Sequence, residues 1–246
     1  MNDEEKILLR KAKDLLQKSE KMFSAVYSYF LTPAQQMFLS EKGEFSGVLT
    51  FEGGYEDAER RLGRICTNEY NRDDGAPIIL YSVRATDKKA ELSHRDILGS
   101  LMGLGIKRET IGDIMTKANT AQFFCHESVA EFVRLNLHKI GHFTVEITEA
   151  DFSEVFEPKK QSVSIHVSAM RLDCITGESF GISRTKAAEF IKKGSVSVNW
   201  QICPDVSREV KEGDKIAMRG KGKIELAGIT GTSKKGRLFV DILKYV

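Results

Sequence analysis

The chain has 246 residues, of which 41% are hydrophobic and 29% charged, so it is long enough for about two domains with buried cores. No apolar run reaches the ~18 residues that a membrane-spanning helix needs, and the charged N-terminus lacks the apolar segment of a signal peptide. The cysteines, at 66, 125, 174 and 203, include no closely spaced pair, which argues against zinc and fits a reducing compartment. We expect a cytoplasmic protein with no membrane partner and no metal.

The charge is unevenly distributed, although its formal sum is only +2. Residues 159–246 contain 17 Lys and Arg against nine Asp and Glu, whereas residues 1–158 contain 20 against 26. A basic C-terminal third on an acidic body predicts that one end of the molecule binds a polyanion. The competing interpretation is a solvated basic surface with no ligand.

Residues 1–74 read as an α-rich unit. Apolar side chains at helical spacing predict a helix over 4–23, and Pro33 suits the first turn of a helix that reaches Leu39. A short strand over 48–52 precedes the chain break at Gly53-Gly54. Acidic residues followed by arginines then predict a helix over 55–62.

Residues 75–155 predict an alternation of strands and helices. In chain order these are a strand, a helix, two strands, a helix and a strand, over 77–85, 94–104, 111–115, 121–126, 129–140 and 143–147. Ser93 and Ser128 are the expected helix caps. The order βαββαβ is typical of the ferredoxin-like fold, which RNA-recognition domains share. The strands carry no convincing aromatic RNA-recognition signature. The excess of acidic residues up to this point argues against this domain being the main RNA-binding part of the protein.

The last third begins with a linker around Pro158 and a strand over 161–169. A short helix follows, which we expect to break at Gly177 and Gly181. Ser183 is placed to cap a second helix that ends near Gly194. Alternation then predicts strands over 196–199 and 215–218, separated by a glycine turn.

The residues of this stretch resemble the αL RNA-binding motif. The motif is carried by Arg171-Leu172-Asp173, Ser183-Arg184-Thr185-Lys186-Ala187, Val198-Asn199, Gly213-Asp214 and Arg219-Gly220. It defines the S-four domain, named after a small-subunit ribosomal protein, in which the helix opened by Ser-Arg docks on structured RNA. The resemblance implies these contact or framework positions: Arg171, Ser183, Arg184, Thr185, Lys186 and Asn199. The other cations of the stretch, Lys192, Lys193 and Arg219, are further expected RNA contacts. Lys221 and Lys223 are added to them, although the Gly-Lys-Gly-Lys run at 220–223 reads equally well as a phosphate contact and as a flexible turn. Trp200 stands where the family usually has Gly. A Trp there suits either stacking on a base or covering the hairpin, and we favour packing on the hairpin.

Two earlier stretches extend the resemblance to essentially the whole chain. Residues 53–60 read Gly-Gly-Tyr-Glu-Asp-Ala-Glu-Arg, and residues 92–99 read Leu-Ser-His-Arg-Asp-Ile-Leu-Gly. Both are similar to the bacterial YlmH family, which implies an N-terminal unit (1–74), a central RNA-recognition-like domain (75–155) and an S-four domain (165–246). The family resemblance also implies further RNA contacts at Arg95, Lys107 and Arg108.

The resemblance implies a role in ribosome-associated quality control. Its expected partners are rRNA of the large ribosomal subunit, tRNA as a second RNA, and other quality-control factors, with the protein helping to add a C-terminal tail to a stalled chain. We expect no catalytic residue and no cofactor. One alternative is an RNA-modifying enzyme. Two observations argue against it: the chain before residue 160 is short for a synthase domain, and it lacks a glycine-rich cofactor loop after a strand. Another alternative is a cell-division accessory protein.

Overall fold

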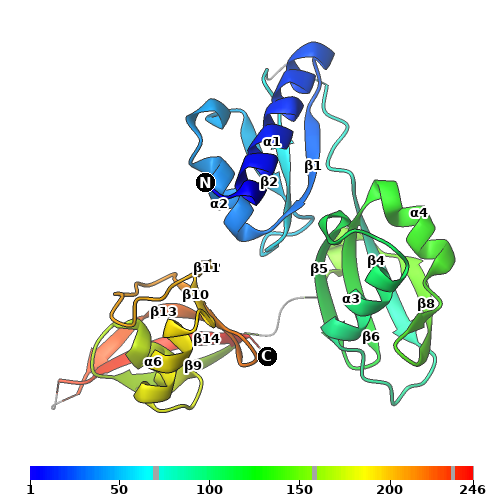
Figure 1. Ribbon diagram of the computed structural model, residues 1–246. Coiled ribbons are helices and arrows are strands. Elements are labelled where there is room, and N and C mark those ends of the chain that lie inside the picture. Colours follow the sequence, from blue (N-terminus) through cyan, green and yellow to red (C-terminus); the bar gives the residue numbers. More distant parts are fainter. Residues whose placement is uncertain (69–71, 157–159, 234–235, 246) are drawn as a thin grey trace. The chain divides into compact units, whose positions relative to one another are not determined.

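The computed structural model describes residues 1–68, 72–156, 160–233 and 236–245. The chain forms two compact units, Met1–Phe156 and Glu157–Val246. Both combine helices with sheets, which confirms the predicted α+β class (Figure 1). The division into three domains stays a prediction, and the structure places the first two parts in one compact unit.

The first unit begins with two capped helices. Helix α1 (Asp3–Met22) starts at Asn2, whose side chain accepts from the Glu5 amide while the Glu5 carboxylate accepts from the Asn2 amide. The same reciprocal capping by Thr32 opens α2 (Pro33–Ser40). Both helices confirm their predictions.

These helices pack against a small antiparallel sheet of order β1-β3-β2. Its strands are β1 (Val26–Leu31), β2 (Leu49–Glu52) and β3 (Arg61–Ile65), and the 3-10 turn η1 (Gly43–Phe45) precedes β2. The helix predicted over 55–62 is therefore wrong. Its arginines, which suggested a helix dipole, instead donate to backbone carbonyls: Arg61 bonds to Ala58 O and Glu56 O at 2.7 Å each, and this fixes a tight loop before β3.

The central part confirms the predicted βαββαβ order. Its elements are β4 (Ile78–Ala85), α3 (His94–Gly103), η2 (Arg108–Thr110), β5 (Ile111–Lys117), β6 (Thr120–His126), α4 (Glu127–Asn136), β7 (Lys139–Ile140) and β8 (Phe143–Glu149). The antiparallel sheet has the order β5-β6-β4-β8-β7, and its first four strands have the ferredoxin-like arrangement. The short η3 turn (Phe152–Glu154) follows β8.

Helix α4 differs from its prediction at both ends. The cap is the His126 side chain, which accepts from the Ser128 amide at 3.1 Å, so Ser128 is not the cap. The helix ends at Asn136, and Ile140 pairs with Phe143 in a β-hairpin, so the apolar residues after the helix belong to a strand.

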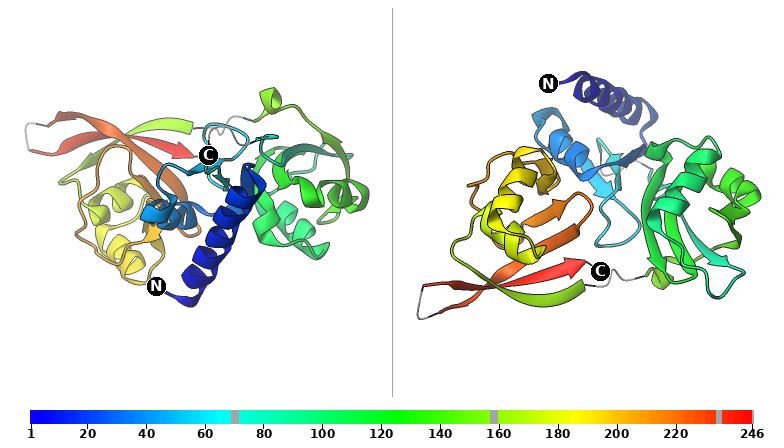
Figure 2. Two further views of the ribbon diagram at one scale, coloured as in Figure 1. Left: turned by 90° about the horizontal axis from the view of Figure 1, so that it is seen from above. Right: turned by 60° about the horizontal axis from the view of Figure 1, so that its bottom comes forward.

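The second unit is a six-stranded sheet with two helices on one face. Its elements are β9 (Lys160–Val167), α5 (Leu172–Ser179), α6 (Arg184–Lys192), β10 (Val196–Val198), β11 (Gln201–Ile202), β12 (Lys215–Met218), β13 (Gly222–Thr232) and β14 (Leu238–Tyr245). The sheet order is β11-β10-β12-β13-β14-β9, and the long β13–β14 hairpin extends beyond the helices (Figure 2). Helix α5 runs through Gly177, so the predicted break there is wrong. The predicted break at Gly181 is confirmed: the helix ends at Ser179 and the chain turns at Gly181, which has φ +63°.

Candidate nucleic-acid interface

A buried aspartate organises the start of both helices in the second unit. Asp173, in the first turn of α5, is 3% exposed. Its Oδ2 accepts from Arg184 Nε at 2.6 Å, and its Oδ1 accepts from Arg171 Nε at 3.2 Å. The Cys174 amide donates to Oδ1 at 3.0 Å. One carboxylate therefore holds two guanidinium groups that lie 11 and 2 residues away in sequence.

The ionised form of Asp173 is favoured by its partners. Burial would raise the pKa of this carboxyl, but the hydrogen bonds and positive charges of Arg184 and Arg171 outweigh burial and lower the pKa below its usual range. The two arginine side chains stay 56% and 40% exposed. The arrangement presents two positioned guanidinium groups, with one buried negative charge beneath them, to a ligand at the surface.

Helix α6 distributes further cations along this surface. Ser183 caps the helix by accepting from the Lys186 amide at 3.3 Å, which confirms the predicted cap. Thr185 and Lys186 are exposed in the first turn. Lys192 and Lys193 are exposed at the other end, about 12 Å from Arg184 along the helix at ~1.5 Å per residue.

Asn199 has a positioning role in the structure. It lies at φ +48°, donates to Asp214 Oδ1 at 2.8 Å and accepts from the Lys215 amide at 2.9 Å. Its side chain thus closes the connection between β10 and β12. Trp200 is half-buried beside it, with the Lys215 ammonium 5.3 Å from its ring centroid.

The three remaining predicted cations do not lie together. The Arg219 amide donates to Ser195 O at 2.9 Å, which places Arg219 near the C-terminal end of α6, and Lys221 is exposed in the following turn. Lys223 lies on β13 with its Nζ 3.7 Å from the Tyr245 ring centroid. Its strand neighbour Ile224 is buried beneath the helices, so Lys223 points to the opposite face of the sheet.

A hollow beside Arg184 was not predicted from the sequence. It has a volume of about 230 Å³ and is lined by Arg184, His166, Val167, Ser168, Cys174, Gly177, Glu178, Ile182 and Arg237. The lining comes from the end of β9, from α5, from the start of α6 and from the turn between β13 and β14. Strand alternation and a glycine-rich turn were visible in the sequence, but neither indicates that these segments meet.

In the first unit, the central sheet has one face covered by α3 and α4 and the other covered by the N-terminal part. Phe124 of β6 is fully buried on the second face. The Tyr55 ring stacks on it at 5.3 Å between centroids and 8° between planes, and Phe152 lies 6.0 Å away. RNA-recognition domains use such a face to stack bases. Here the protein itself occupies it.

A polar contact fixes the same junction. The Asp113 carboxylate of β5 accepts from the Tyr55 hydroxyl at 3.0 Å and from the amides of Glu59 and Arg60 at 2.6 and 3.0 Å. The Arg60 guanidinium donates to Ile111 O at 2.9 Å. Burial lowers the pKa of Arg60 to about 10. These bonds hold the loop before β3 against the central sheet.

The second predicted set of RNA contacts is divided by the structure. Arg95 and Lys107 are exposed. Arg108 is half-buried and donates through one terminal nitrogen to Ile111 O at 2.6 Å and to Gly112 O at 3.3 Å, so that nitrogen is committed to the protein.

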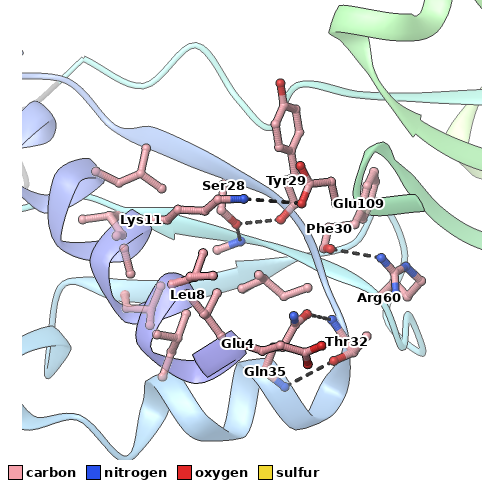
Figure 3. A pocket seen from close by; sticks show the side chains of 18 of the residues that line it. Glu4, Leu8, Lys11, Ser28, Tyr29, Phe30, Thr32, Gln35, Arg60 and Glu109 are labelled. Carbon is pink, nitrogen blue, oxygen red and sulfur yellow. Dashed lines mark hydrogen bonds and ion pairs between the residues drawn. The ribbon is translucent and has the colours of Figure 1, made fainter. Parts of the chain in front are cut away.

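A larger hollow lies between α1, β1, α2 and η2 (Figure 3). It measures about 540 Å³ and is lined mainly by apolar side chains, including Leu8, Leu15 and Phe30. The Lys11–Glu109 ion pair, 3.5 Å long, connects α1 to η2 at this hollow. Its apolar lining does not suit a polyanion.

The described part of the chain holds neither a cluster of metal ligands nor a membrane-spanning helix. Among those residues, no three His, Cys, Asp or Glu side chains gather in a way that would hold a metal ion. No described helix is long and apolar enough to cross a membrane.

Comparison with known proteins identifies two domains. Residues 73–154 match the family model "Putative RNA-binding domain in YlmH", and residues 178–216 match the S4 domain. A Bacillus subtilis (strain 168) protein named "Ribosome-associated protein quality control protein P2" is 36% identical over 214 residues, covering 85% of this chain and 82% of that protein. The solved structure titled "Cell division protein ylmH from Streptococcus pneumoniae" superposes with a TM-score of 0.53 over 64% of this chain and 97% of that chain, and its 21% identity shows a shared fold alone. With both domains present and this identity over most of its length, the chain belongs to the YlmH family.

Proposed function

We propose that this protein binds the large ribosomal subunit and acts in the rescue and quality control of stalled nascent chains. The observation that carries the proposal is the pair of arginines held by buried Asp173 on the α5–α6 surface. The name of the Bacillus subtilis relative supports the ribosomal setting, and the two matched RNA-binding domains support RNA as the ligand.

The geometry suits RNA phosphates. Arg184 reaches Asp173 through Nε, and within the described residues no hydrogen bond engages its two terminal nitrogens. These nitrogens are the ones with which arginine binds phosphate in a fixed orientation. Exposed Lys186, Lys192 and Lys193 extend the positive surface along α6. Selectivity then comes from the shape of the helix pair, because duplex RNA hides its base edges in a deep groove.

We assign the acidic first unit the role of an adaptor. Its central sheet has both faces covered, so we expect contacts with tRNA or with another quality-control factor to use exposed edges, with Arg95 and Lys107 as the first residues to test. In this proposal the protein is a binding factor in the cytoplasm, and it assists C-terminal tailing of the stalled chain without catalysing a reaction itself.

Co-sedimentation with purified ribosomal subunits tests the proposal. We expect the wild-type protein to pellet with large subunits that carry peptidyl-tRNA, and Arg184→Ala/Lys186→Ala to remain in the supernatant. Lys88→Ala/Lys89→Ala is the matched control, because it removes two exposed positive charges from the first unit. Equal binding of wild type and the α6 variant, or equal loss with both variants, would contradict the proposal.

Salt dependence gives a quantitative criterion. If about four phosphates are engaged, the logarithm of the affinity falls with the logarithm of salt concentration at a slope of about −3 to −4. A salt-insensitive affinity would refute the electrostatic account. Product formation in an isotopic assay on rRNA or tRNA would favour a modifying enzyme instead.

A further inference from the structure

The 230 Å³ hollow beside Arg184 lies at the edge of the proposed RNA surface. We infer that it is a subsite for one unpaired ribonucleotide of the bound RNA, with its phosphate between Arg184 and Arg237 and its base or ribose against the floor of the hollow. The inference rests on the proposed RNA-binding role of this surface and adds residues outside the αL motif.

The lining divides into a charged rim and a buried floor. Arg184, Arg237 and Glu178 are exposed, whereas Val167, Cys174 and Gly177 are buried. Two cations against one carboxylate favour an anionic ligand. The terminal nitrogens of Arg184 are oriented by the Nε bond to Asp173, so one rim group is already positioned.

The size and chemistry select a single nucleotide. The volume is below the ~300–1,000 Å³ that is typical of small-molecule sites, so the hollow takes only part of one nucleotide, its base or its ribose, and leaves the phosphate at the rim. A double helix cannot enter such a hollow, whereas proteins commonly read RNA through unpaired bases that turn out of the helix. Glu178 supplies an acceptor for a ribose 2′-hydroxyl, the group that distinguishes RNA from DNA.

The ring of His166 does not take part in the subsite. Its strand neighbours Ile165 and Val167 are buried beneath the helices, so the His166 side chain points to the opposite face of the sheet, where its ring meets Phe239 edge-on with 4.7 Å between centroids and 80° between planes. The side chains that face a nucleotide in the hollow are therefore those of the rim and of Ser168.

The test fills the hollow without changing charge. Ser168 is exposed and lines the hollow, so Ser168→Phe should block it, whereas Ser164→Phe places the same side chain on exposed β9 outside the hollow. We expect Ser168→Phe to weaken binding about tenfold, as expected for the loss of one nucleotide's contacts with the protein, and Ser164→Phe to bind as wild type. The probes are purified large ribosomal subunits and protein-free large-subunit rRNA.

A second variant tests the phosphate contact and does not depend on how Ser168→Phe folds. We expect Arg237→Ala to make the salt slope less negative by about 1, and Lys211→Ala, an exposed cation of the same unit that does not line the hollow, to leave it unchanged. An unchanged slope with Arg237→Ala, or wild-type binding by folded Ser168→Phe, would overturn the subsite.

The two probes separate this inference from the proposed function. Suppose that Ser168→Phe weakens rRNA binding and Arg237→Ala changes its salt slope, but the wild type does not bind large subunits. The proposed ribosomal function is then refuted and the subsite stands. If wild type pellets with large subunits and neither variant has an effect on either probe, the function stands and the subsite is refuted.

Discussion

Replacing Asp173 with asparagine distinguishes two explanations of RNA binding, the net positive charge of the surface and the fixed orientation of its arginines. Simple electrostatics predicts tighter binding, because the substitution removes a negative charge beneath the surface. Positioning predicts weaker binding, because Arg184 and Arg171 lose the carboxylate that orients them. We expect Asp173→Asn to weaken rRNA binding about tenfold, although both arginines remain.

The same substitution should destabilise the second unit. Asp173 is buried and accepts hydrogen bonds from two guanidinium groups, and hydrogen bonds to charged groups contribute about 1.5–3 kcal/mol each. Because both arginines are partly exposed, we expect a total loss of about 2–4 kcal/mol. For a unit of this size the melting temperature should fall by at least about 8 °C.

The substitution should also change how the stability of the second unit depends on pH. The folded pKa of Asp173 lies below the usual value, so its contribution is present above about pH 4 and is lost as pH falls through the folded pKa. The wild type should therefore lose stability in acid more steeply than Asp173→Asn.

The assays are calorimetry of the full chain and fluorescence anisotropy with labelled rRNA. Glu189→Gln is the control, because it removes one exposed negative charge from α6 without touching the arginine pair. It should bind as tightly as wild type or more tightly. If Asp173→Asn binds like Glu189→Gln and melts like the wild type, the positioning argument is refuted.

Three further predictions concern packing and internal hydrogen bonds. Gly54→Ala should destabilise the first unit by about 2–4 kcal/mol in urea unfolding, since its Cβ would meet the Phe124 ring at 2.6 Å. Gly105→Ala is the control and should cost only about 1 kcal/mol, because Gly105 has a similar positive φ but no atom within 4 Å of the added Cβ. Asp113→Asn should lower the melting temperature of the first unit and leave rRNA affinity unchanged, because its hydrogen bonds lie at the internal junction; an unchanged melting temperature would argue against that junction. Asn199→Ala should destabilise the second unit by about 1–3 kcal/mol, and Asn199→Gly by less, because glycine tolerates φ +48°; equal losses would contradict this account.

Local patterns were sufficient for much of the fold. Hydrophobic spacing and hydroxyl caps located α1, α3 and α6, and the strand and helix order predicted the ferredoxin-like sheet. The failures arose where a distant contact decided the outcome. Arg60 and Arg61 suggested a helix, yet their guanidinium groups bind carbonyls of a loop and of β5. Helix α4 stopped early because the chain after it forms a hairpin.

The candidate site shows the same limit. The motif indicated Arg171 and Arg184, but not that buried Asp173 joins them. His166 and Arg237 were not predicted as a site because 70 residues of chain lie between them. Sequence spacing gives the face of one element, and only the folded sheet brings such segments to one hollow.

The two RNA-binding domains of this chain differ in what they leave accessible. In the central domain, a base can stack on Phe124 only if Tyr55, Gly54 and the junction at Asp113 move away, which breaks three hydrogen bonds and exposes an apolar cluster. In the second unit, two arginines are half-exposed and already oriented by a buried carboxylate. Binding at the second site needs no rearrangement of the core, so RNA should engage it first. The first unit, whose central sheet is covered on both faces, then has its exposed edges left for a partner.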